Sequence, residues 1–194
     1  MKYYQIYKPY GMLSQFTREG GKTSLADLGF EFEKDVYPVG RLDANSEGLL
    51  ILTNDPSINQ LLLQPEKKIA KKYLVLLDGN PDEEKMKALR GKMQISLDGE
   101  KHQCHFKSVR VLSEVPEVAA IEGNFKERKP EKLCWIEVVL EEGKNRQIRK
   151  MTASLNLPAL RIIRVAIGGI QIVRHLPGEV LETTRAKLLT NLNL

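Results

Sequence analysis

The sequence has few of the residues that build disulfide frameworks or metal sites. Its 194 residues include only two cysteines and three histidines. Cys104 and Cys134 fall in separate strand-like segments, which favours two reduced core thiols over a disulfide. The segment His102-Gln-Cys-His105 gathers three possible ligands, but a tetrahedral site would need nearly every remaining candidate in the chain. We therefore expect neither a disulfide nor a bound metal.

Long apolar runs and nucleotide-binding glycine motifs are also absent. No apolar stretch is long enough to cross a bilayer, and no charged segment followed by an apolar one opens the chain. Neither the phosphate-binding loop of nucleotide hydrolases nor the dinucleotide fingerprint occurs. These absences argue against membrane, secreted and nucleotide-dependent proteins. We expect a cytoplasmic protein that needs no cofactor.

The composition is that of a globular chain with a modest basic excess. Hydrophobic residues make up 42% and charged residues 28%, enough for one substantial core. The formal net charge is +5 and the isoelectric point is near 9.1. Such a charge suits a polyanionic partner without requiring one, so the placement of the basic residues matters more than their number.

Periodicity and turn residues predict many strands with a few short helices. Strands are expected at residues 2–8, 36–39, 48–53, 69–77, 93–97, 105–112 and 133–140 and within 159–172. Helices are expected at 56–63, with Asp55 as N-cap, at 81–90 and at 145–155. The strands and helices do not alternate regularly, which predicts an α+β fold with mixed or antiparallel sheets. We expect a single domain over residues 1–194.

The segment from Tyr37 to Asp55 presents one carboxylate, Asp43, between a glycine turn and an apolar strand. Gly40 allows a tight turn or a close approach of another backbone, and Gly48 precedes the apolar run 49–52. This arrangement predicts that Asp43 is displayed on a stiff loop. An isolated Asp in such a loop is more often only a turn cap.

The densest basic segment runs from residue 144 to residue 164 and contains no Asp or Glu. Its basic residues are Lys144, Arg146, Arg149, Lys150, Arg161 and Arg164. Arg146 and Lys150 are four residues apart and share one face of the expected helix, whereas Arg149 points elsewhere. The segment is typical of a phosphate-binding face, and equally of a solvated basic helix.

Several motifs together resemble the RsuA-type family of RNA pseudouridine synthases. Gly-Arg-Leu-Asp43, followed by Ser-Glu-Gly-Leu-Leu and Leu-Thr-Asn-Asp55, is similar to the family's catalytic motif, whose Asp is the catalytic residue. The family's third motif is similar to the segment Glu-Gly-Lys-Asn-Arg-Gln-Ile-Arg-Lys-Met151. In the family, an arginine of this motif pairs with the catalytic carboxylate, and the match puts that arginine at Arg149. Lys-Lys-Tyr73 is similar to the family's strand motif. The resemblance covers nearly the whole chain.

Two weaker matches lie near the ends of the resemblance. Lys-Pro-Tyr-Gly11 is similar to the family's first motif, and the segment 160–168 to the one that supplies an apolar wall to the uracil pocket, here through Ile167. The family fold is a long mixed sheet in two halves with a central cleft. Many members begin with an S4-type RNA-binding module, and we expect none here because the catalytic strand begins at Tyr3.

The resemblance implies isomerisation of uridine to pseudouridine without a metal or cofactor. This chemistry breaks the N1 to C1′ bond, turns the uracil and rejoins it through C5. Asp43 would act at the ribose, as nucleophile at C1′ or as base at C2′, and both roles stay open. Arg149 would hold the Asp43 carboxylate. Tyr73 would stack on uracil and assist proton loss from C5.

The resemblance further implies a site-specific action on 23S, large-subunit, ribosomal RNA by a monomer. The uridine would be flipped from a stem or loop, with Arg41 filling the vacated stack. Contacts to the RNA backbone would come from Lys71, Lys72, Lys144, Arg146 and Lys150. The alternatives are a noncatalytic RNA-binding or ribosome-assembly protein on the same fold, and a synthase acting on small-subunit ribosomal RNA or tRNA. A glycosidase-like hydrolase would need a second carboxylate to activate water.

Overall fold

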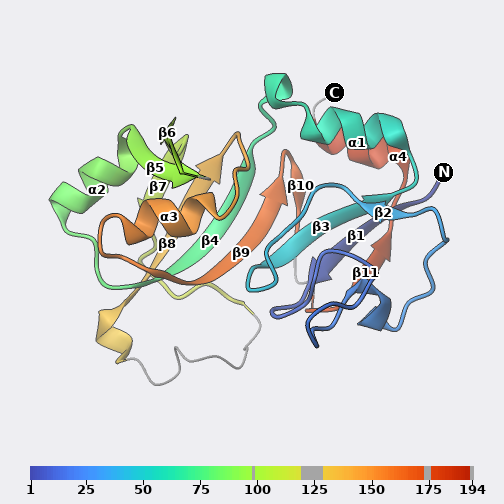
Figure 1. Cartoon of the computed structure of the whole chain (residues 1–194), viewed down its shortest axis with the longest axis horizontal. Helices are drawn as coiled ribbons and strands as arrows, with labels where there is room; N and C mark the ends of the chain where they lie inside the picture. The colour runs from blue at the N-terminus through green and yellow to red at the C-terminus, as the bar shows by residue number, and fades with distance from the viewer. Residues whose placement is uncertain (98, 119–128, 173–175, 193–194) are drawn as a thin grey trace. The chain divides into compact units, whose positions relative to one another are not determined.

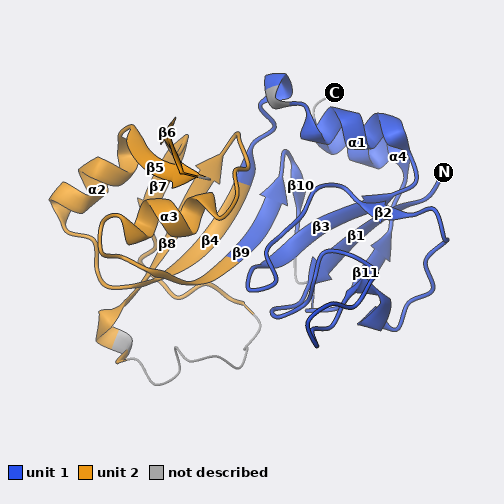
Figure 2. Cartoon of the chain, in the orientation of Figure 1, with its two compact units in different colours: residues 1–71, 163–194 blue, residues 72–162 orange. Residues whose placement is uncertain are grey.

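The structure is a computed structural model that describes residues 1–97, 99–118, 129–172 and 176–192 (Figure 1). The chain forms two compact units (Figure 2). Unit 1 comprises Met1–Lys71 and Ile163–Leu194, and unit 2 comprises Lys72–Ile162. Strand β9 (Ala159–Ile167) carries the chain from unit 2 into unit 1.

Unit 1 is built on the strand order β11-β1-β3-β9. Strand β1 (Tyr3–Lys8) pairs antiparallel with both β3 (Glu47–Thr53) and β11 (Val180–Glu182). Strand β3 pairs in parallel with β9 at Glu47↔Ile163 and Gly48↔Arg164. Two short strands, β2 (Tyr37–Pro38) and β10 (Ile170–Gln171), pair with β3 and β9 respectively. The sheet of unit 1 is therefore mixed.

Both faces of β3 are buried, which explains its continuous apolar sequence. Leu49 and Ile51 belong to one core cluster, whereas Leu50 and Leu52 belong to another, because successive side chains of a strand point to opposite faces. The first cluster also contains buried side chains of helices α1 (Pro56–Leu63) and α4 (Arg185–Leu192) (Figure 1). The second lies under the loop region that contains the 3-10 helix η1 (Leu25–Leu28).

Helix α1 begins as the sequence predicts. Asp55 is its N-cap and accepts hydrogen bonds from the Ser57 backbone N–H (2.9 Å) and hydroxyl (2.6 Å), while Pro56 occupies the first helical position. Tyr3 donates to the other Asp55 oxygen at 2.8 Å, so the cap is also tied to β1. A short 3-10 helix, η2 (Pro65–Lys67), follows α1.

Unit 2 contains the strand order β9-β4-β8-β7. Strands β4 (Lys71–Asp78), β7 (Ser108–Val111) and β8 (Leu133–Leu140) belong to this sheet, and β7 is antiparallel to β8. A separate antiparallel pair is formed by β5 (Met93–Leu97) and β6 (Glu100–Cys104). Its helices are α2 (Glu83–Arg90), α3 (Gln147–Ala153), which packs against β5, and the 3-10 helix η4 (Pro130–Lys132).

The predicted α+β class is confirmed, with differences in particular elements. Strands β6 and β11 and helix α4 were not predicted. Helix α2 begins at Glu83, two residues later than predicted, because Asp82 is its N-cap. Both cysteines are free thiols, as predicted, and burial raises the pKa of each. In the described part of the chain, no helix is long and apolar enough to span a membrane.

Candidate active site

Asp43 lies on a tight turn in the loop between β2 and β3 of unit 1. The Asp43 carbonyl accepts a hydrogen bond from the Ser46 N–H at 3.0 Å, which closes the turn. Leu42, before it, is buried, whereas Arg41 is exposed and Asp43 itself is half-buried. The loop therefore presents the carboxylate while its neighbour anchors the backbone in the core.

Glycines stand on both sides of this loop, each with a positive φ that residues with a side chain rarely adopt. Gly40 has φ +71°, and a Cβ there would lie 3.1 Å from Cδ2 of Leu63. Gly48 has φ +104°, and a Cβ there would lie 2.3 Å from the carbonyl oxygen of Arg164. Gly48 and Arg164 face each other in the parallel pairing of β3 with β9. A close backbone approach thus occurs at Gly48, where it was not predicted, whereas the atom within 4 Å of the Cβ position at Gly40 belongs to a side chain.

Buried charges surround the start of β3. Lys8, at the end of β1, is fully buried, as is Glu47, and Arg164 on β9 is 5% exposed. Tyr7 donates to the Glu47 carboxylate at 3.0 Å, and Arg164 Nε donates to the Leu49 carbonyl at 2.8 Å. These contacts fix both groups within the sheet of unit 1.

Asp43 interacts electrostatically with this charged cluster through Lys8. Burial lowers the pKa of Lys8 to about 7, the attraction of Glu47 and of Asp43 opposes that shift, and the repulsion of Arg164 adds to it. Sequence reasoning did not predict this cluster. The only signal for Lys8 was the weak match to the family's first motif.

Tyr73 and Arg149, the other two predicted catalytic residues, lie in unit 2. Tyr73 is on β4 and is 7% exposed, so little of its side chain reaches solvent. Arg149 is half-buried on α3, and its Nη1 donates to the Ala159 carbonyl at 2.6 Å. Unit 2 thus carries a buried phenol and a partly buried guanidinium. The catalytic roles of Tyr73 and Arg149 stay predictions.

The helix predicted at residues 145–155 is shorter in the structure, so Arg146 does not share a helix face with Lys150 as predicted. The helix begins at Gln147, and Arg146 is its N-cap in the left-handed conformation, with φ 52°. Lys144 Nζ lies 3.4 Å from His102 Nδ1, and Lys150 Nζ donates to the Ser96 carbonyl at 2.8 Å. Both lysines therefore lie over the β5–β6 hairpin.

The remaining predicted RNA-binding residues differ in exposure. The Lys71 ammonium donates to the Ile69 carbonyl at 3.1 Å, and burial together with the repulsion of Arg164 lowers its pKa. Lys72 Nζ lies 3.7 Å from Glu137 Oε2, and the Lys72 side chain is 41% exposed. Ile167 is 4% exposed within the core cluster that also contains side chains of α1 and α4. Its role as a uracil wall stays a prediction, since core packing accounts for its burial.

No group of three or more His, Cys, Asp or Glu side chains in the described residues is arranged to hold a metal ion. The residues gathered around Asp43 are instead suited to acid–base and electrostatic chemistry. They offer one accessible carboxylate beside buried cations.

Comparison with other sequences assigns the chain to a known family. The family profile described as RNA pseudouridylate synthase matches residues 2–154. Ribosomal large subunit pseudouridine synthase E of Xanthomonas axonopodis pv. citri is 41% identical over 165 residues, which cover 84% of this chain and 84% of the relative. The protein of the same name in Vibrio vulnificus is 37% identical over 172 residues, covering 89% of this chain and 70% of the relative.

Comparison with solved structures gives the same fold. A crystal structure of a pseudouridylate synthase superposes with a TM-score of 0.73 at 21% identity, covering 98% of this chain and 73% of that one. A structure of an H/ACA ribonucleoprotein bound to a substrate RNA containing 2′-deoxyuridine superposes with a TM-score of 0.54 at 19% identity, covering 91% of this chain and 50% of that one. The predicted fold is thereby confirmed.

Proposed function

Because the chain belongs to the RNA pseudouridylate synthase family, we propose that it isomerises one uridine of large-subunit ribosomal RNA to pseudouridine. The observation that carries the proposal is Asp43, the motif carboxylate, held on a glycine-flanked turn and half-exposed. Relatives with 37% and 41% identity are named as synthases of the ribosomal large subunit, which supports the choice of RNA.

In the proposed reaction Asp43 acts as a carboxylate on the ribose. It either attacks C1′ or removes the proton at C2′, and both steps need the ionised form. The guanidinium of Arg149 holds this carboxylate by a charge-assisted contact. Tyr73 supplies a ring that stacks on uracil and a hydroxyl that assists proton loss from C5.

The RNA must deliver a uridine out of its helix, because the glycosidic bond is inaccessible within a base stack. Arg41 is exposed next to Leu42 and Asp43, where it can replace the flipped base. Lys72, Lys144, Arg146 and Lys150 supply cations for the phosphate backbone. The partly buried Lys71 is the weakest of the predicted contacts. We propose that the enzyme acts as a cytoplasmic monomer.

The decisive experiment maps pseudouridines in total RNA from cells with and without this protein. We expect one position of large-subunit ribosomal RNA to lose its pseudouridine. A plasmid copy should restore the position, and a copy carrying Asp43→Asn should not, because the amide keeps the volume but loses the charge. Equal accumulation of both proteins is the control.

Other outcomes of the mapping would select the alternatives. Loss of a pseudouridine from small-subunit ribosomal RNA or tRNA would replace the proposed substrate. An unchanged map would favour a noncatalytic RNA-binding protein. Restoration of the pseudouridine by the Asp43→Asn copy would contradict the role of Asp43.

A further inference from the structure

Ser14 makes a two-way hydrogen bond to the residue immediately before Asp43. Its hydroxyl donates to the Leu42 carbonyl at 2.9 Å and accepts from the Leu42 N–H at 3.0 Å. Both Ser14 and Leu42 are buried. Ser14 therefore satisfies both backbone polar groups of Leu42 in a place where water does not replace it.

The residue immediately after Asp43 is tied to the same segment of the chain. The Ala44 carbonyl accepts from the Gly11 N–H at 2.8 Å and from the buried ammonium of Lys8 at 3.3 Å. The same ammonium donates to the carbonyls of Pro9 and Met12, at 2.8 and 2.7 Å. Lys8 thus stabilises the backbone conformation of residues 9–12 and also contacts the loop that carries Asp43.

We propose that Ser14, supported by Lys8, is a positioning residue that fixes the Asp43 carboxylate for attack on the ribose. The inference rests on the proposed catalytic role of Asp43 and adds the residues that hold the Asp43 carboxylate in position. Both chain neighbours of Asp43 are hydrogen-bonded to residues 8–14, so the Asp43 backbone cannot shift unless buried hydrogen bonds break.

Serine suits this position because one oxygen must donate and accept at the same time. A hydroxyl has one donor and two acceptor sites, whereas an alanine leaves both groups of Leu42 without that partner. The loop would then move to recover hydrogen bonds. A displacement of about 1 Å at a catalytic group can cost about 100-fold in rate.

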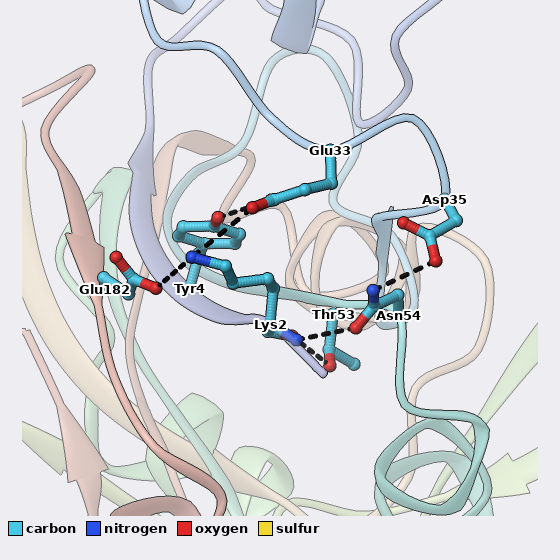
Figure 3. A network of polar contacts seen from close by, with 7 residues as sticks. All are labelled: Lys2, Tyr4, Glu33, Asp35, Thr53, Asn54 and Glu182. Atoms are coloured by element: carbon cyan, nitrogen blue, oxygen red, sulfur yellow. Dashed lines mark hydrogen bonds and ion pairs between the residues drawn. The ribbon is translucent and has the colours of Figure 1, made fainter.

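Thr53 provides a matched control at the other end of β3. Its buried hydroxyl donates to the Lys2 carbonyl at 2.6 Å and accepts from the Asp55 N–H at 3.0 Å, which is the same pattern as at Ser14. Figure 3 shows Thr53 beside Lys2 and Asn54, in a polar network that contains Tyr4 and Glu33. Thr53→Val removes an equivalent pair of hydrogen bonds remote in sequence from Asp43.

The experiment compares wild type, Ser14→Ala, Thr53→Val and Asp43→Asn on an RNA fragment that the wild type modifies. Single-turnover rates at saturating RNA, Kd for the RNA and melting temperatures are measured for each protein. We expect Ser14→Ala to react about 10- to 100-fold more slowly with an unchanged Kd. Thr53→Val should lose a similar amount of thermal stability and keep the wild-type rate.

A wild-type rate in Ser14→Ala, or an equal loss of rate in Thr53→Val, would overturn the positioning role. If Ser14→Ala does not fold, Ser14→Cys takes its place, because a thiol keeps most of the volume but is a weak donor and acceptor. A wild-type rate in that variant would likewise overturn the proposal. Activity in Asp43→Asn would instead contradict the proposed catalytic role of Asp43, and a wild type that modifies no ribosomal RNA would contradict the proposed function, so these failures are distinguishable.

Discussion

At the scale of single residues, Lys8 is a cation inside the fold whose protonation depends on its surroundings. It is fully buried, and its pKa is lowered to about 7 mainly by that burial. Three carbonyl oxygens accept its hydrogen bonds, so the ammonium is solvated by the backbone rather than by water. The folded state nevertheless holds this proton less tightly than the unfolded chain, where a lysine titrates near 10.5.

This difference predicts how stability changes with pH. Between pH 7 and pH 10.5 the unfolded state binds a proton that the folded state has lost, so the free energy of unfolding rises with pH across that window. From pH 6 to pH 9 we expect wild type to gain about 2 to 3 kcal/mol relative to Lys8→Met. Urea denaturation of both proteins at the two pH values measures this gain, with Lys87→Met as the exposed control. A pH-independent difference between wild type and Lys8→Met would contradict the prediction.

Gly48 is a second residue whose identity is dictated by its surroundings. An alanine there would place Cβ 2.3 Å from the Arg164 carbonyl oxygen in a backbone conformation with φ +104°. We expect Gly48→Ala to lower the free energy of unfolding by about 2 to 5 kcal/mol, from strain and overlap together. Gly20→Ala is the control, since Gly20 has φ +57° with nothing within 4 Å of its Cβ position. Its cost should be only about 1 kcal/mol, and equal losses of stability would show that overlap at Gly48 does not matter.

At the scale of elements, the start of helix α1 depends on the ionised form of Asp55. Its pKa is lowered to about 2, mainly by the Ser57 hydroxyl and then by Tyr3, against the opposing effect of burial. The resulting stability is present above pH 4 and is lost as the pH falls through 2. The side chain thereby links the helix terminus to β1 as long as it is charged.

We therefore expect Asp55→Asn to lower the free energy of unfolding by about 0.5 to 1.5 kcal/mol at neutral pH, because the amide keeps one oxygen for the cap but loses the acceptor of Tyr3 and the charge at the helix N-terminus. The gap to wild type should narrow as the pH falls from 4 to 2. Denaturation midpoints of wild type and Asp55→Asn between pH 4 and pH 2 measure this difference in stability. Asp82→Asn, at the N-cap of α2, is a matched control in unit 2. A gap that stays constant down to pH 2 would show that the charge of Asp55 does not stabilise the helix.

At the scale of the whole molecule, the net charge of +5 matters through where the basic residues lie. If Lys144, Arg146 and Lys150 contact phosphates, their joint replacement by Gln should weaken RNA binding and reduce the slope of log affinity against log salt by about 0.7 to 0.9 for each lost contact. The single-turnover rate at saturating RNA should change little. Titrations of RNA binding at several salt concentrations measure the slope.

A matched control removes the same charge elsewhere in unit 2. Lys85, Lys87 and Arg90 lie on α2, and their replacement by Gln changes the net charge by the same amount. Equal effects of the two triple variants would mean that only total charge attracts the RNA. A collapsed chemical rate with an unchanged salt slope would mean instead that the residues around α3 serve catalysis.

Elements with a strong local signal were predictable. Strand β8 has the predicted bounds, Leu133–Leu140, because its sequence is a run of apolar residues interrupted only by Glu137 and bounded by charged residues. Helix α1 was predictable from its cap and its proline. Strand β6 was missed because Glu-Lys-His-Gln-Cys104 has no apolar alternation and is defined by its pairing with β5. Helix α4 was missed because neither a proline nor an acidic residue marks its first turn, although Leu188 and Leu192 are buried.

The Asp43 motif, the flanking glycines and the helix cap could be predicted from the sequence, since each depends on residues close together in the chain. The burial of Lys8, Glu47 and Arg164 follows from the fold, because a charged residue in a sequence gives no sign of its solvation. Only the tertiary structure joined Ser14 to Leu42, across 28 positions. Such long-range hydrogen bonds arise when the sheet of unit 1 brings distant segments together, and no local pattern encodes them.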